Sequence, residues 1–363
     1  MSKKGRVLVA MSGGVDSSVA AIMLHEQGYE VIGITMKTWD YASAGGSSKE
    51  TGCCSLDSIN DARALAVGLG FPHYILDIRD EFGDFVIDNF VDEYIAGRTP
   101  NPCVLCNTHI KWSALMKRAD KLDCEFIATG HYANIRLHDN GRYVISKGQD
   151  ENKDQSYVLW GVSQENLART QFPLGGFTKQ EIRQMALEMG QEELAKKSES
   201  YEICFVPDND YRAFLRHKRP TLDDEIGPGN FVLSDGTVVG QHIGYPYFTI
   251  GQRKGLGIAL GKPMFVIEIL PESNTVMLGE EHELEKSHAL VRDINLIKYA
   301  SIEQSIEAIT KIRYKDAGAQ STITQKGNVM QVDFAHRVKG IAPGQSAVFY
   351  EGNDLLGGGF LMK

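Results

Sequence analysis

The segment best suited to chemistry lies near the N-terminus, where Ser12-Gly13-Gly14-Val15-Asp16-Ser17-Ser18 follows a short apolar run, Val7–Met11. Glycines let backbone N–H groups approach phosphate oxygens closely, and the N-terminus of a following helix adds a favourable dipole. The serine hydroxyls can donate further hydrogen bonds, and Asp16 can hold a magnesium ion on a polyphosphate. The spacing therefore indicates an anion site. The alternative interpretation is a plain Gly-rich turn between a strand and a helix.

This loop lacks the Gly-Lys-Ser/Thr of a Walker A motif. It resembles instead the SGGxDS signature of the PP-loop ATP pyrophosphatases. The resemblance implies that ATP, with Mg²⁺, is cleaved between its α and β phosphates and that a substrate is adenylated. Ligands of such sheets lie at the carboxyl ends of the strands, which adds two residues there. The residues expected to bind ATP are Ala10, Met11, Ser12, Gly13, Gly14, Val15, Asp16, Ser17, Met36 and Gly130.

A second segment, Arg98-Thr99-Pro100-Asn101-Pro102-Cys103-Val104-Leu105-Cys106-Asn107, carries two thiols. Its prolines favour a stiff, extended approach, after which Cys106 and Asn107 are predicted to begin a helix. A thiol at a helix N-terminus has a lowered pKa, and the thiolate is the nucleophilic form. The C-x-x-C spacing also fits half of a zinc site, but no second C-x-x-C supplies the remaining ligands. These features favour Cys106 as a catalytic nucleophile.

A more distant thiol, Cys204, lies within Ser198–Phe205, and a lone cysteine there is typical of a buried apolar residue. The interpretation of this segment depends on the other motifs of the chain. The phosphate loop, Arg98–Asn107, Lys153–Tyr157, Ser198–Phe205 and Thr249–Gly257 occur in this one order. In this combination the chain resembles the bacterial tRNA-specific 2-thiouridylase family over nearly its whole length.

The resemblance implies sulfur transfer to tRNA, most specifically to the C2 position of the wobble uridine. ATP would adenylate the C2 oxygen to make a good leaving group, and sulfur would then displace AMP. By resemblance, Cys204 receives a persulfide sulfur from a donor protein, and Cys106 attacks the persulfide or otherwise frees its sulfur. A Cys106–Cys204 disulfide would remain and need reduction.

Cys103 departs from the commoner family pattern, in which many members have an Asp with an acid/base role at this position. Three thiols, on Cys103, Cys106 and Cys204, would also suit an iron–sulfur cluster with one open iron that carries an extra sulfide. The persulfide route and the cluster route both stay open on the sequence, and both require Cys106 and Cys204.

A target base must be flipped out of the RNA to reach these thiols. By resemblance, Asn101, Pro102 and Cys103 line its pocket. Other positions that match tRNA contacts of the family are His131, Lys153, Asp154, Gln155, Arg313, Tyr314 and Gln345. Cations near phosphates and an aromatic ring for stacking fit this role, although each residue alone is typical of an ordinary surface. Weaker candidates for backbone contacts are Arg212, Arg216, His217, Lys218, Arg253 and Lys254.

Positioning these segments requires a scaffold, and residues 1–130 alternate apolar runs with helical patterns, which predicts a parallel sheet covered by helices. The predicted strands are Val7–Met11, Val31–Met36, His73–Ile78 and Glu125–Thr129, and the predicted helices are Ser17–Gln27, Leu56–Leu69, Phe82–Ala96 and Asn107–Lys121. Beyond them, Asn140-Gly141 predicts a hairpin. A short strand is expected at Ile203–Val206 and a basic helix at Tyr211–Lys218.

From Gly227 onward short strands dominate, which indicates two small β modules. We therefore predict an α/β fold with a Rossmann-like parallel sheet that carries the PP-loop, as in the N-type ATP pyrophosphatases. A small central domain and a C-terminal β-barrel-like domain follow. The expected boundaries are 1–208, 209–283 and 284–363.

Composition limits the partners and the compartment. The net charge of −9 counts mildly against nucleic acid, although local clustering of Lys and Arg decides the matter. No apolar stretch of about 18 residues is present, and the N-terminal apolar run is too short for a signal peptide. We expect a cytoplasmic protein with no membrane contact and with reduced thiols. Cys53 and Cys54 are interpreted as incidental thiols in a mobile loop near the nucleotide.

Two rival functions stay open. A synthetase with the same loop that adenylates a small molecule and transfers nitrogen would need neither Cys106 nor Cys204. A non-catalytic RNA-binding module that uses ATP as a structural ligand would bind tRNA without releasing AMP.

Overall fold

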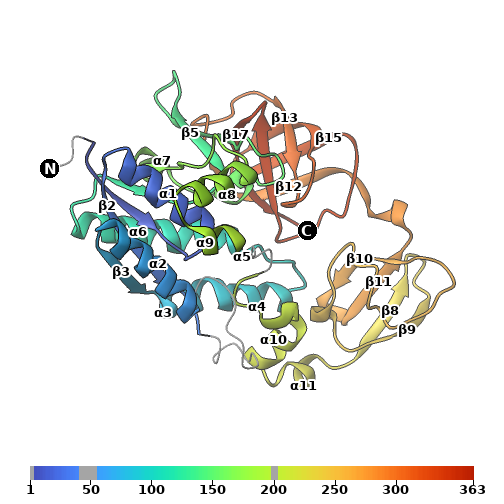
Figure 1. Ribbon diagram of the computed structural model, residues 1–363. Coiled ribbons are helices and arrows are strands. Elements are labelled where there is room, and N and C mark those ends of the chain that lie inside the picture. Colours follow the sequence, from blue (N-terminus) through green and yellow to red (C-terminus); the bar gives the residue numbers. More distant parts are fainter. Residues whose placement is uncertain (1–3, 41–54, 198–202) are drawn as a thin grey trace. The chain divides into compact units, whose positions relative to one another are not determined.

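The computed structural model describes residues 4–40, 55–197 and 203–363. They form two compact units: residues up to 85 with 103–209 and 353–355, and residues 86–102 with 210–352 and 356–363. Figure 1 labels the helices and strands of both units. Cys53, Cys54 and the loop expected around them lie outside the described residues. Among the described residues, no helix is long and apolar enough to cross a membrane.

A five-stranded parallel sheet forms the centre of the first unit. Its strands, in order of pairing, are β3 (His73–Asp77), β2 (Glu30–Lys37), β1 (Arg6–Ala10), β4 (Phe126–Ala128) and β7 (Thr170–Gln171). The strand β1 pairs in parallel with β2 on one side and with β4 on the other. The chain thus leaves β1 toward one edge and later returns toward the other. In sheets of this kind, ligands bind beyond the carboxyl ends of the strands at this point of reversal.

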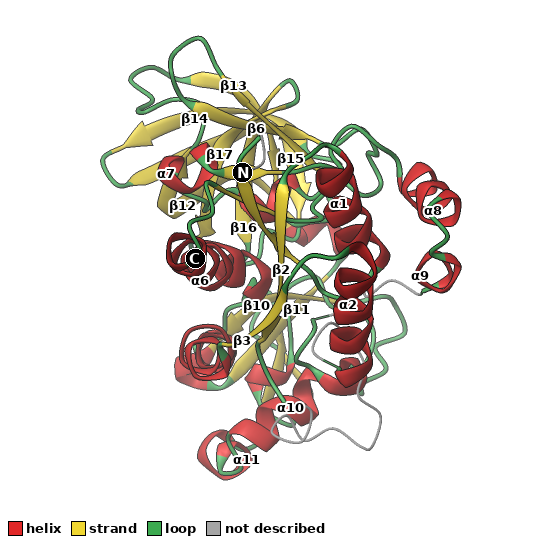
Figure 2. Ribbon diagram, turned by 60° about the vertical axis from the view of Figure 1, so that its left-hand side comes forward, coloured by secondary structure: helices red, strands yellow, loops and turns green. Residues whose placement is uncertain are grey.

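Helices cover both faces of this sheet. α1 contacts β1 and β2, α2 contacts β2 and β3, and α6 contacts β1 and β4. Figure 2 shows α1 and α2 on one side of β2 and α6 on the other. Buried Val7, Val9 and Val31 pack against Ala21 and Leu24 of α1 to form this core. The α- and π-helices among the described residues up to 209 are α1 (Val15–Glu26), α2 (Leu56–Leu69), α3 (Arg79–Phe82), η2 (Gly83–Ile87), α4 (Asp88–Ile95), α5 (Pro102–Leu105), η3 (Cys106–Lys111), α6 (Trp112–Lys121), α7 (Gln164–Ala168), α8 (Lys179–Glu188) and α9 (Glu192–Lys196).

The predicted strand–helix alternation of residues 1–130 is confirmed, and the helix Leu56–Leu69 has the predicted bounds. Local chemistry explains these bounds, because the Ser55 side chain accepts a hydrogen bond from the backbone of Ser58 and Gly70 ends the helix with φ of 76°. The predicted hairpin is also present, as β5 (Ala133–Leu137) and β6 (Tyr143–Lys147).

Two local predictions are wrong. The helix that carries Cys106 begins at Pro102 and runs through α5, the π-helix η3 and α6 without a break. Proline is favourable at the first helical position because its missing N–H would have no partner there, so Cys103 rather than Cys106 lies in the first turn. The expected strand at Ile203–Val206 is instead a turn, closed by a hydrogen bond from Val206 N to Ile203 O of 3.1 Å.

The second unit begins within the helical segment 79–95 because α4 packs against α10 (Tyr211–Lys218). Phe90 and Phe214 meet at a ring-centroid distance of 5.8 Å, and Tyr94 stacks on Tyr211 at 4.6 Å. Residues 86–102 therefore group with later parts of the chain, and the two units divide the chain differently from the three predicted domains. The helix α11 (Leu222–Ile226) and a four-stranded sheet follow. The strands of that sheet are β10 (Phe265–Leu270), β11 (Thr275–Gly279), β8 (Gly229–Leu233) and β9 (Val238–His242).

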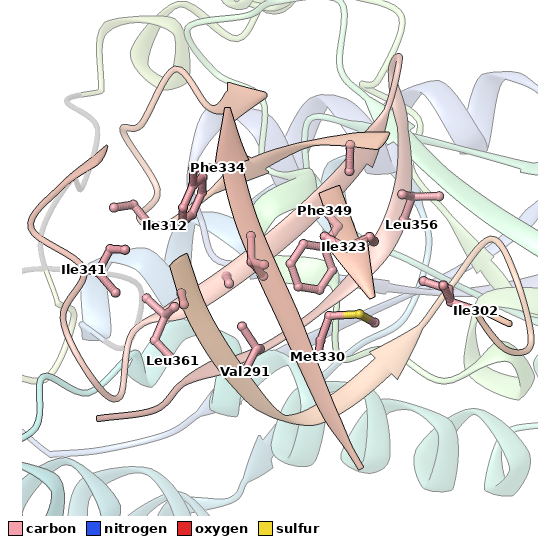
Figure 3. Packing of buried hydrophobic residues seen from close by; sticks show 14 residues of the cluster. Val291, Ile302, Ile312, Ile323, Met330, Phe334, Ile341, Phe349, Leu356 and Leu361 are labelled. Atoms are coloured by element: carbon pink, nitrogen blue, oxygen red, sulfur yellow. The ribbon is translucent and has the colours of Figure 1, made fainter. Parts of the chain in front are cut away.

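The last part of the second unit is a closed barrel of six strands. In order of pairing they are β12 (Glu285–Leu296), β15 (Val329–Lys339), β14 (Ala319–Lys326), β13 (Ile306–Lys311), β16 (Ser346–Glu351) and β17 (Asp354–Leu361). Pairing of β12 with β17 closes the ring. Its interior is filled by buried side chains such as Ile323, Met330 and Phe349 (Figure 3). The predicted fold class, a parallel α/β sheet followed by a small central domain and a C-terminal barrel, is confirmed.

Candidate functional site

The phosphate loop lies directly beyond β1 and turns into α1 at Gly14, whose extended backbone occupies the N-cap position. The Ser17 hydroxyl closes the loop, since it accepts a hydrogen bond from Ser12 N at 3.0 Å and donates one to Gly14 O at 3.2 Å. Gly13 has φ of +71°, and an added Cβ would lie 2.0 Å from the carbonyl oxygen of Ser58. The N–H groups of the first turn of α1 have no partner within the helix, so this loop presents donors to an anion.

Gly130 follows β4 and lies against the same loop. A Cβ at this position would lie 2.8 Å from Ser17 N and 3.1 Å from Ser17 Cα. Met36 lies near the end of β2, on the other side of β1. The structure therefore brings the residues expected to bind ATP together at the carboxyl ends of the neighbouring strands β2, β1 and β4.

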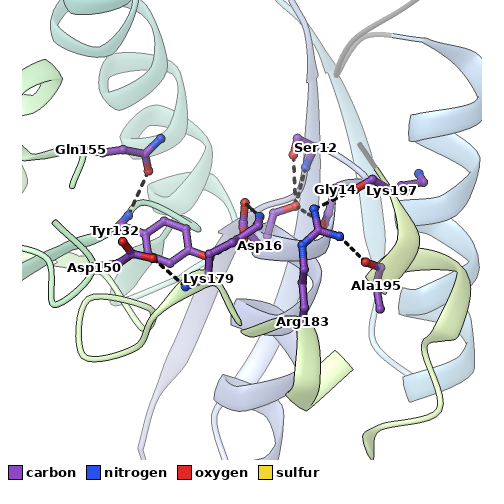
Figure 4. A network of polar contacts seen from close by, with 11 residues as sticks. Ser12, Gly14, Asp16, Tyr132, Asp150, Gln155, Lys179, Arg183, Ala195 and Lys197 are labelled. Atoms are coloured by element: carbon purple, nitrogen blue, oxygen red, sulfur yellow. Dashed lines mark hydrogen bonds and ion pairs between the residues drawn. The ribbon is translucent and has the colours of Figure 1, made fainter. Parts of the chain in front are cut away.

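A buried cation that the sequence analysis missed faces this loop. Lys179 Nζ lies 2.7 Å from both carboxylate oxygens of Asp16, and Tyr132 donates a hydrogen bond of 2.6 Å to Asp16 Oδ1 (Figure 4). Lys179 is only 8% exposed. A signal for this role was present in the sequence: Lys179 is the first residue of α8, where the helix dipole disfavours a cation.

A second lysine lies on the other side of the loop. Lys197 Nζ donates a hydrogen bond of 2.8 Å to Gly13 O and forms an ion pair with Asp61. Arg183 holds the backbone of this segment, through hydrogen bonds to Ala195 O and to Lys197 O. The chain between α8 and Lys197 thus places two ammonium groups on the phosphate loop, as an anion site requires (Figure 4).

The segments that carry Cys106 and Cys204 both lie in the first unit and pack against residues 79–85 of the same unit. Phe205, next to Cys204, meets Phe82 of α3 edge-to-face at a centroid distance of 5.6 Å. His109, on the same π-helix as Cys106, stacks on Phe85 at 6.3 Å. Phe82 and Phe85, which lie three residues apart in one short helical segment, therefore each contact one of the two thiol-bearing segments.

The two thiols differ in surroundings. Cys106 is buried within η3, whereas Cys204 lies exposed in its turn. A π-helix is a rare, less regular backbone that is frequently found at functional sites, and η3 begins at Cys106 itself. The Cys106 thiol is thus enclosed by the protein, whereas the Cys204 thiol is accessible to solvent.

Cys103 and His131 share the electrostatic field of Lys111. Burial, together with the positive charge of Lys111 as the smaller cause, lowers the pKa of His131 to about 3. Desolvation raises the pKa of Cys103, while Lys111 acts in the opposite direction. Cys103 is nevertheless accessible to solvent. His131 Nδ1 lies 2.7 Å from Thr129 Oγ1, and its ring packs against Trp112 at 5.8 Å.

The three cysteines expected to hold a cluster are not gathered as ligands. Within residues 4–40, 55–197 and 203–363, no group of three or more His, Cys, Asp or Glu side chains is placed to hold a metal ion. The cysteines of those residues also form no disulfide with one another. The arrangement thus does not fit an iron–sulfur cluster on Cys103, Cys106 and Cys204.

Two of the residues expected to touch tRNA hold the protein's own backbone. Asp154 is buried and accepts hydrogen bonds from Gly148 N at 3.1 Å and from Ser156 N at 3.1 Å. Gln155 Oε1 accepts from Tyr132 N at 3.0 Å. Lys153, in the same segment, is half-buried. These side chains shape a loop beside Tyr132, and thereby beside the phosphate loop.

Arg313, Tyr314 and Gln345, which were also expected to touch tRNA, lie in the second unit. Arg313 and Tyr314 are exposed at the end of β13, whereas Gln345 donates hydrogen bonds to the backbone of Thr99 and Pro100. The basic face of α10 is engaged within its unit. Arg216 pairs with Asp223 at 2.7 Å and stacks over the ring of Tyr247 at 4.3 Å.

Comparison with known proteins covers almost the whole chain. A family model described as "tRNA methyl transferase HUP domain" matches residues 5–208. Models described as "tRNA methyl transferase PRC-barrel domain" and "Aminomethyltransferase beta-barrel domain" match residues 213–280 and 286–361.

Curated relatives give a more specific description. The "tRNA-specific 2-thiouridylase MnmA" of Cytophaga hutchinsonii is 66% identical over 362 residues, which span 99% of this chain and 98% of the relative. The protein of the same name from Salinibacter ruber is 57% identical over 364 residues and covers 99% of this chain and 95% of the relative. Among solved structures, a 4-thiouridine synthetase–RNA complex with bound ATP matches remotely, at 18% identity and a TM-score of 0.35, over 60% of this chain and 51% of that one.

Proposed function

The chain belongs to the tRNA-specific 2-thiouridylase family, and on that premise we propose that it replaces the C2 oxygen of the wobble uridine of tRNA with sulfur, using ATP. Family membership makes the chain an enzyme that thiolates uridine in tRNA. The observation that carries the finer proposal is the packing of the Cys106 and Cys204 segments on residues 79–85, in the unit that also contains the phosphate loop.

Activation of the uridine is the first step of the proposed reaction. The C2 oxygen attacks the α-phosphorus of ATP, the bond to the β-phosphate oxygen breaks, and pyrophosphate leaves. The N–H groups beyond Gly14 and the ammonium groups of Lys179 and Lys197 would hold the polyphosphate. Asp16 is the residue that would hold Mg²⁺, whose charge would neutralise the departing pyrophosphate.

Delivery of sulfur is the second step, and we propose the persulfide route. A donor protein transfers a sulfur atom to the exposed thiol of Cys204. The Cys106 thiolate then attacks Cys204 Sγ, the S–S bond breaks, and the terminal sulfur leaves as hydrosulfide. Hydrosulfide attacks C2, AMP departs with the electron pair of the C2–O bond, and a Cys106–Cys204 disulfide remains. A thiol reductant must supply two electrons before the next cycle.

Cys103 and His131 have a different part in this proposal. A thiol with a raised pKa is protonated at neutral pH, so Cys103 would act as a hydrogen-bond donor to the base and not as a nucleophile. His131, with its pKa lowered to about 3, is uncharged at neutral pH. Its flat, neutral ring suits contact with a flipped uridine, which has no charge of its own.

The proposed function predicts products that the rivals do not. With tRNA, ATP, Mg²⁺ and a persulfide donor, we expect AMP release and 2-thiouridine in equal amounts, measured by chromatography and by nucleoside mass spectrometry. Transcripts with cytidine at the wobble position serve as the control and should give neither product. AMP release without tRNA would favour a small-molecule synthetase, and tRNA binding without AMP would favour a binding module.

Substitution of Cys103 separates the two sulfur routes. We expect Cys103→Ser, purified without oxygen, to contain no iron or acid-labile sulfide, like the wild type, and to keep thiolation within roughly tenfold of it, since only one hydrogen bond to the base changes. Iron assays, absorbance spectra and 2-thiouridine yields measure this. A wild-type enzyme whose activity tracks a bound cluster that Cys103→Ser loses would replace the persulfide route by the cluster route.

A further inference from the structure

The short segment that leads into the thiol-bearing helix is held by the loop between β15 and β16. Thr99 N donates a hydrogen bond of 2.8 Å to Pro343 O. Gln345 Nε2 donates to Thr99 O at 3.2 Å and to Pro100 O at 2.8 Å. All of these residues belong to the second unit. The segment is thus fixed on both its N–H and its carbonyl sides.

The carbonyls matter because Pro100 and Pro102 have no N–H. Few backbone donors remain in this segment, so its position depends on groups that donate to its carbonyl oxygens. The single amide nitrogen of Gln345 supplies two such hydrogen bonds. Both of its N–H groups are therefore used inside the protein, although Gln345 was expected from the family resemblance to contact tRNA.

The neighbouring residues fit the same purpose. Gly344 has φ of +89°, and a Cβ there would lie 2.8 Å from Thr99 O and 2.9 Å from Glu93 Oε2. Glu93, only 9% exposed, binds the guanidinium of Arg98 through two hydrogen bonds of 2.7 and 2.5 Å. A glycine and a nearly buried ion pair thus let the β15–β16 loop approach the segment closely.

We propose that Gln345 is a positioning residue, which holds Thr99 and Pro100 so that the helix beginning at Pro102 presents Cys103 and Cys106 in the reactive arrangement. The inference rests on the proposed function for its catalytic consequence. Its structural part, that Gln345 holds the backbone of Thr99 and Pro100 just before the helix, can be tested without any RNA.

The test compares Gln345→Ala and Gln345→Glu with the wild type in two assays. A displacement of about 1 Å in a reactive group lowers rates on the order of 100-fold. We therefore expect kcat for thiolation to fall by roughly 10- to 100-fold, while the Kd for tRNA changes by less than about threefold. Without RNA, the rates at which iodoacetamide alkylates Cys103 and Cys106 should differ several-fold between the variants and the wild type. Peptide mass spectrometry measures these rates relative to that of Cys124, a buried thiol elsewhere in the first unit.

Gln320→Ala is the matched control, because Gln320 is an exposed glutamine of the same barrel. It should match the wild type in both assays, and melting temperatures of all variants establish that they fold. A weaker Kd for tRNA with unchanged kcat and unchanged alkylation would show an RNA contact and overturn the proposal. Unchanged behaviour in all three measurements would overturn it as well. If the wild type forms no 2-thiouridine, the proposed function fails, while the alkylation assay still decides whether Gln345 restrains the helix.

Discussion

Cys106→Ser and Cys204→Ser are each expected to abolish formation of 2-thiouridine, by at least 1,000-fold, because a serine hydroxyl is neither a persulfide acceptor nor a thiolate nucleophile. Binding of ATP and of tRNA should persist in both variants, because neither thiol belongs to the phosphate loop. Nucleoside mass spectrometry measures the product, and AMP release measures activation of the base.

The two variants should stop at different points. In Cys106→Ser, a persulfide should accumulate on Cys204, which is exposed and can still accept sulfur from the donor. In Cys204→Ser, no protein persulfide should form on this thiol. Intact-protein mass spectrometry distinguishes the two states by the mass of one sulfur atom.

Cys124→Ala is the matched control for both variants. Its thiol is buried, and burial raises its pKa to about 11, so it stays protonated at neutral pH. It should retain thiolation, with at most the loss of stability that a smaller core side chain brings. Full activity in Cys106→Ser or in Cys204→Ser would refute sulfur transfer through these thiols and would favour a synthetase that uses only the phosphate loop.

Lys179→Met is expected to lower kcat/KM for ATP by roughly 10- to 100-fold, since hydrogen bonds to charged groups are worth about 1.5–3 kcal/mol each. The substitution removes a cation that contacts both oxygens of Asp16 at 2.7 Å. It leaves the Asp16 carboxylate uncompensated, and this charge would repel the polyphosphate. Rates of AMP formation at varied ATP concentration measure the effect.

Lys196→Met provides the comparison, because Lys196 is an exposed lysine that pairs only weakly, at 3.3 Å, with Glu193. It should leave the KM for ATP unchanged. The double variant Asp16→Asn/Lys179→Met tests whether the two residues act together. For residues in direct contact, the free energy that corresponds to the loss of kcat/KM for ATP should be smaller in the double variant than the sum for the two single variants. An unaltered KM for ATP in Lys179→Met would exclude this lysine from the nucleotide site.

Some of this site follows directly from the sequence. A phosphate loop consists of neighbouring residues, so an apolar strand, two glycines and a helix start are sufficient to predict it, and the structure has each of them in place. The helix Leu56–Leu69 is predictable for the same reason, because Ser55 and Gly70 set its ends through bonds to adjacent residues. The thiols and their order along the chain, together with the family resemblance, indicate the chemistry.

Contacts between distant residues could be learned only from the tertiary structure. The partners Lys179 and Asp16, the support of Phe205 by Phe82, and the two hydrogen bonds from Gln345 join residues that are far apart in sequence. Even the start of the helix at Pro102 escaped prediction, although proline at a first helical position is common. No local propensity encodes such pairings, because they arise when packing of the core brings separate elements together.

The amino-acid sequence therefore determined which groups are available for the reaction: a phosphate-binding loop and a pair of distant cysteines. The tertiary structure decided which charges face the loop, which thiol is exposed and which is buried. The physical reason is the separation along the chain over which each kind of interaction acts. Backbone preferences act over a few residues, whereas burial and ion pairing depend on where the whole chain places its surfaces.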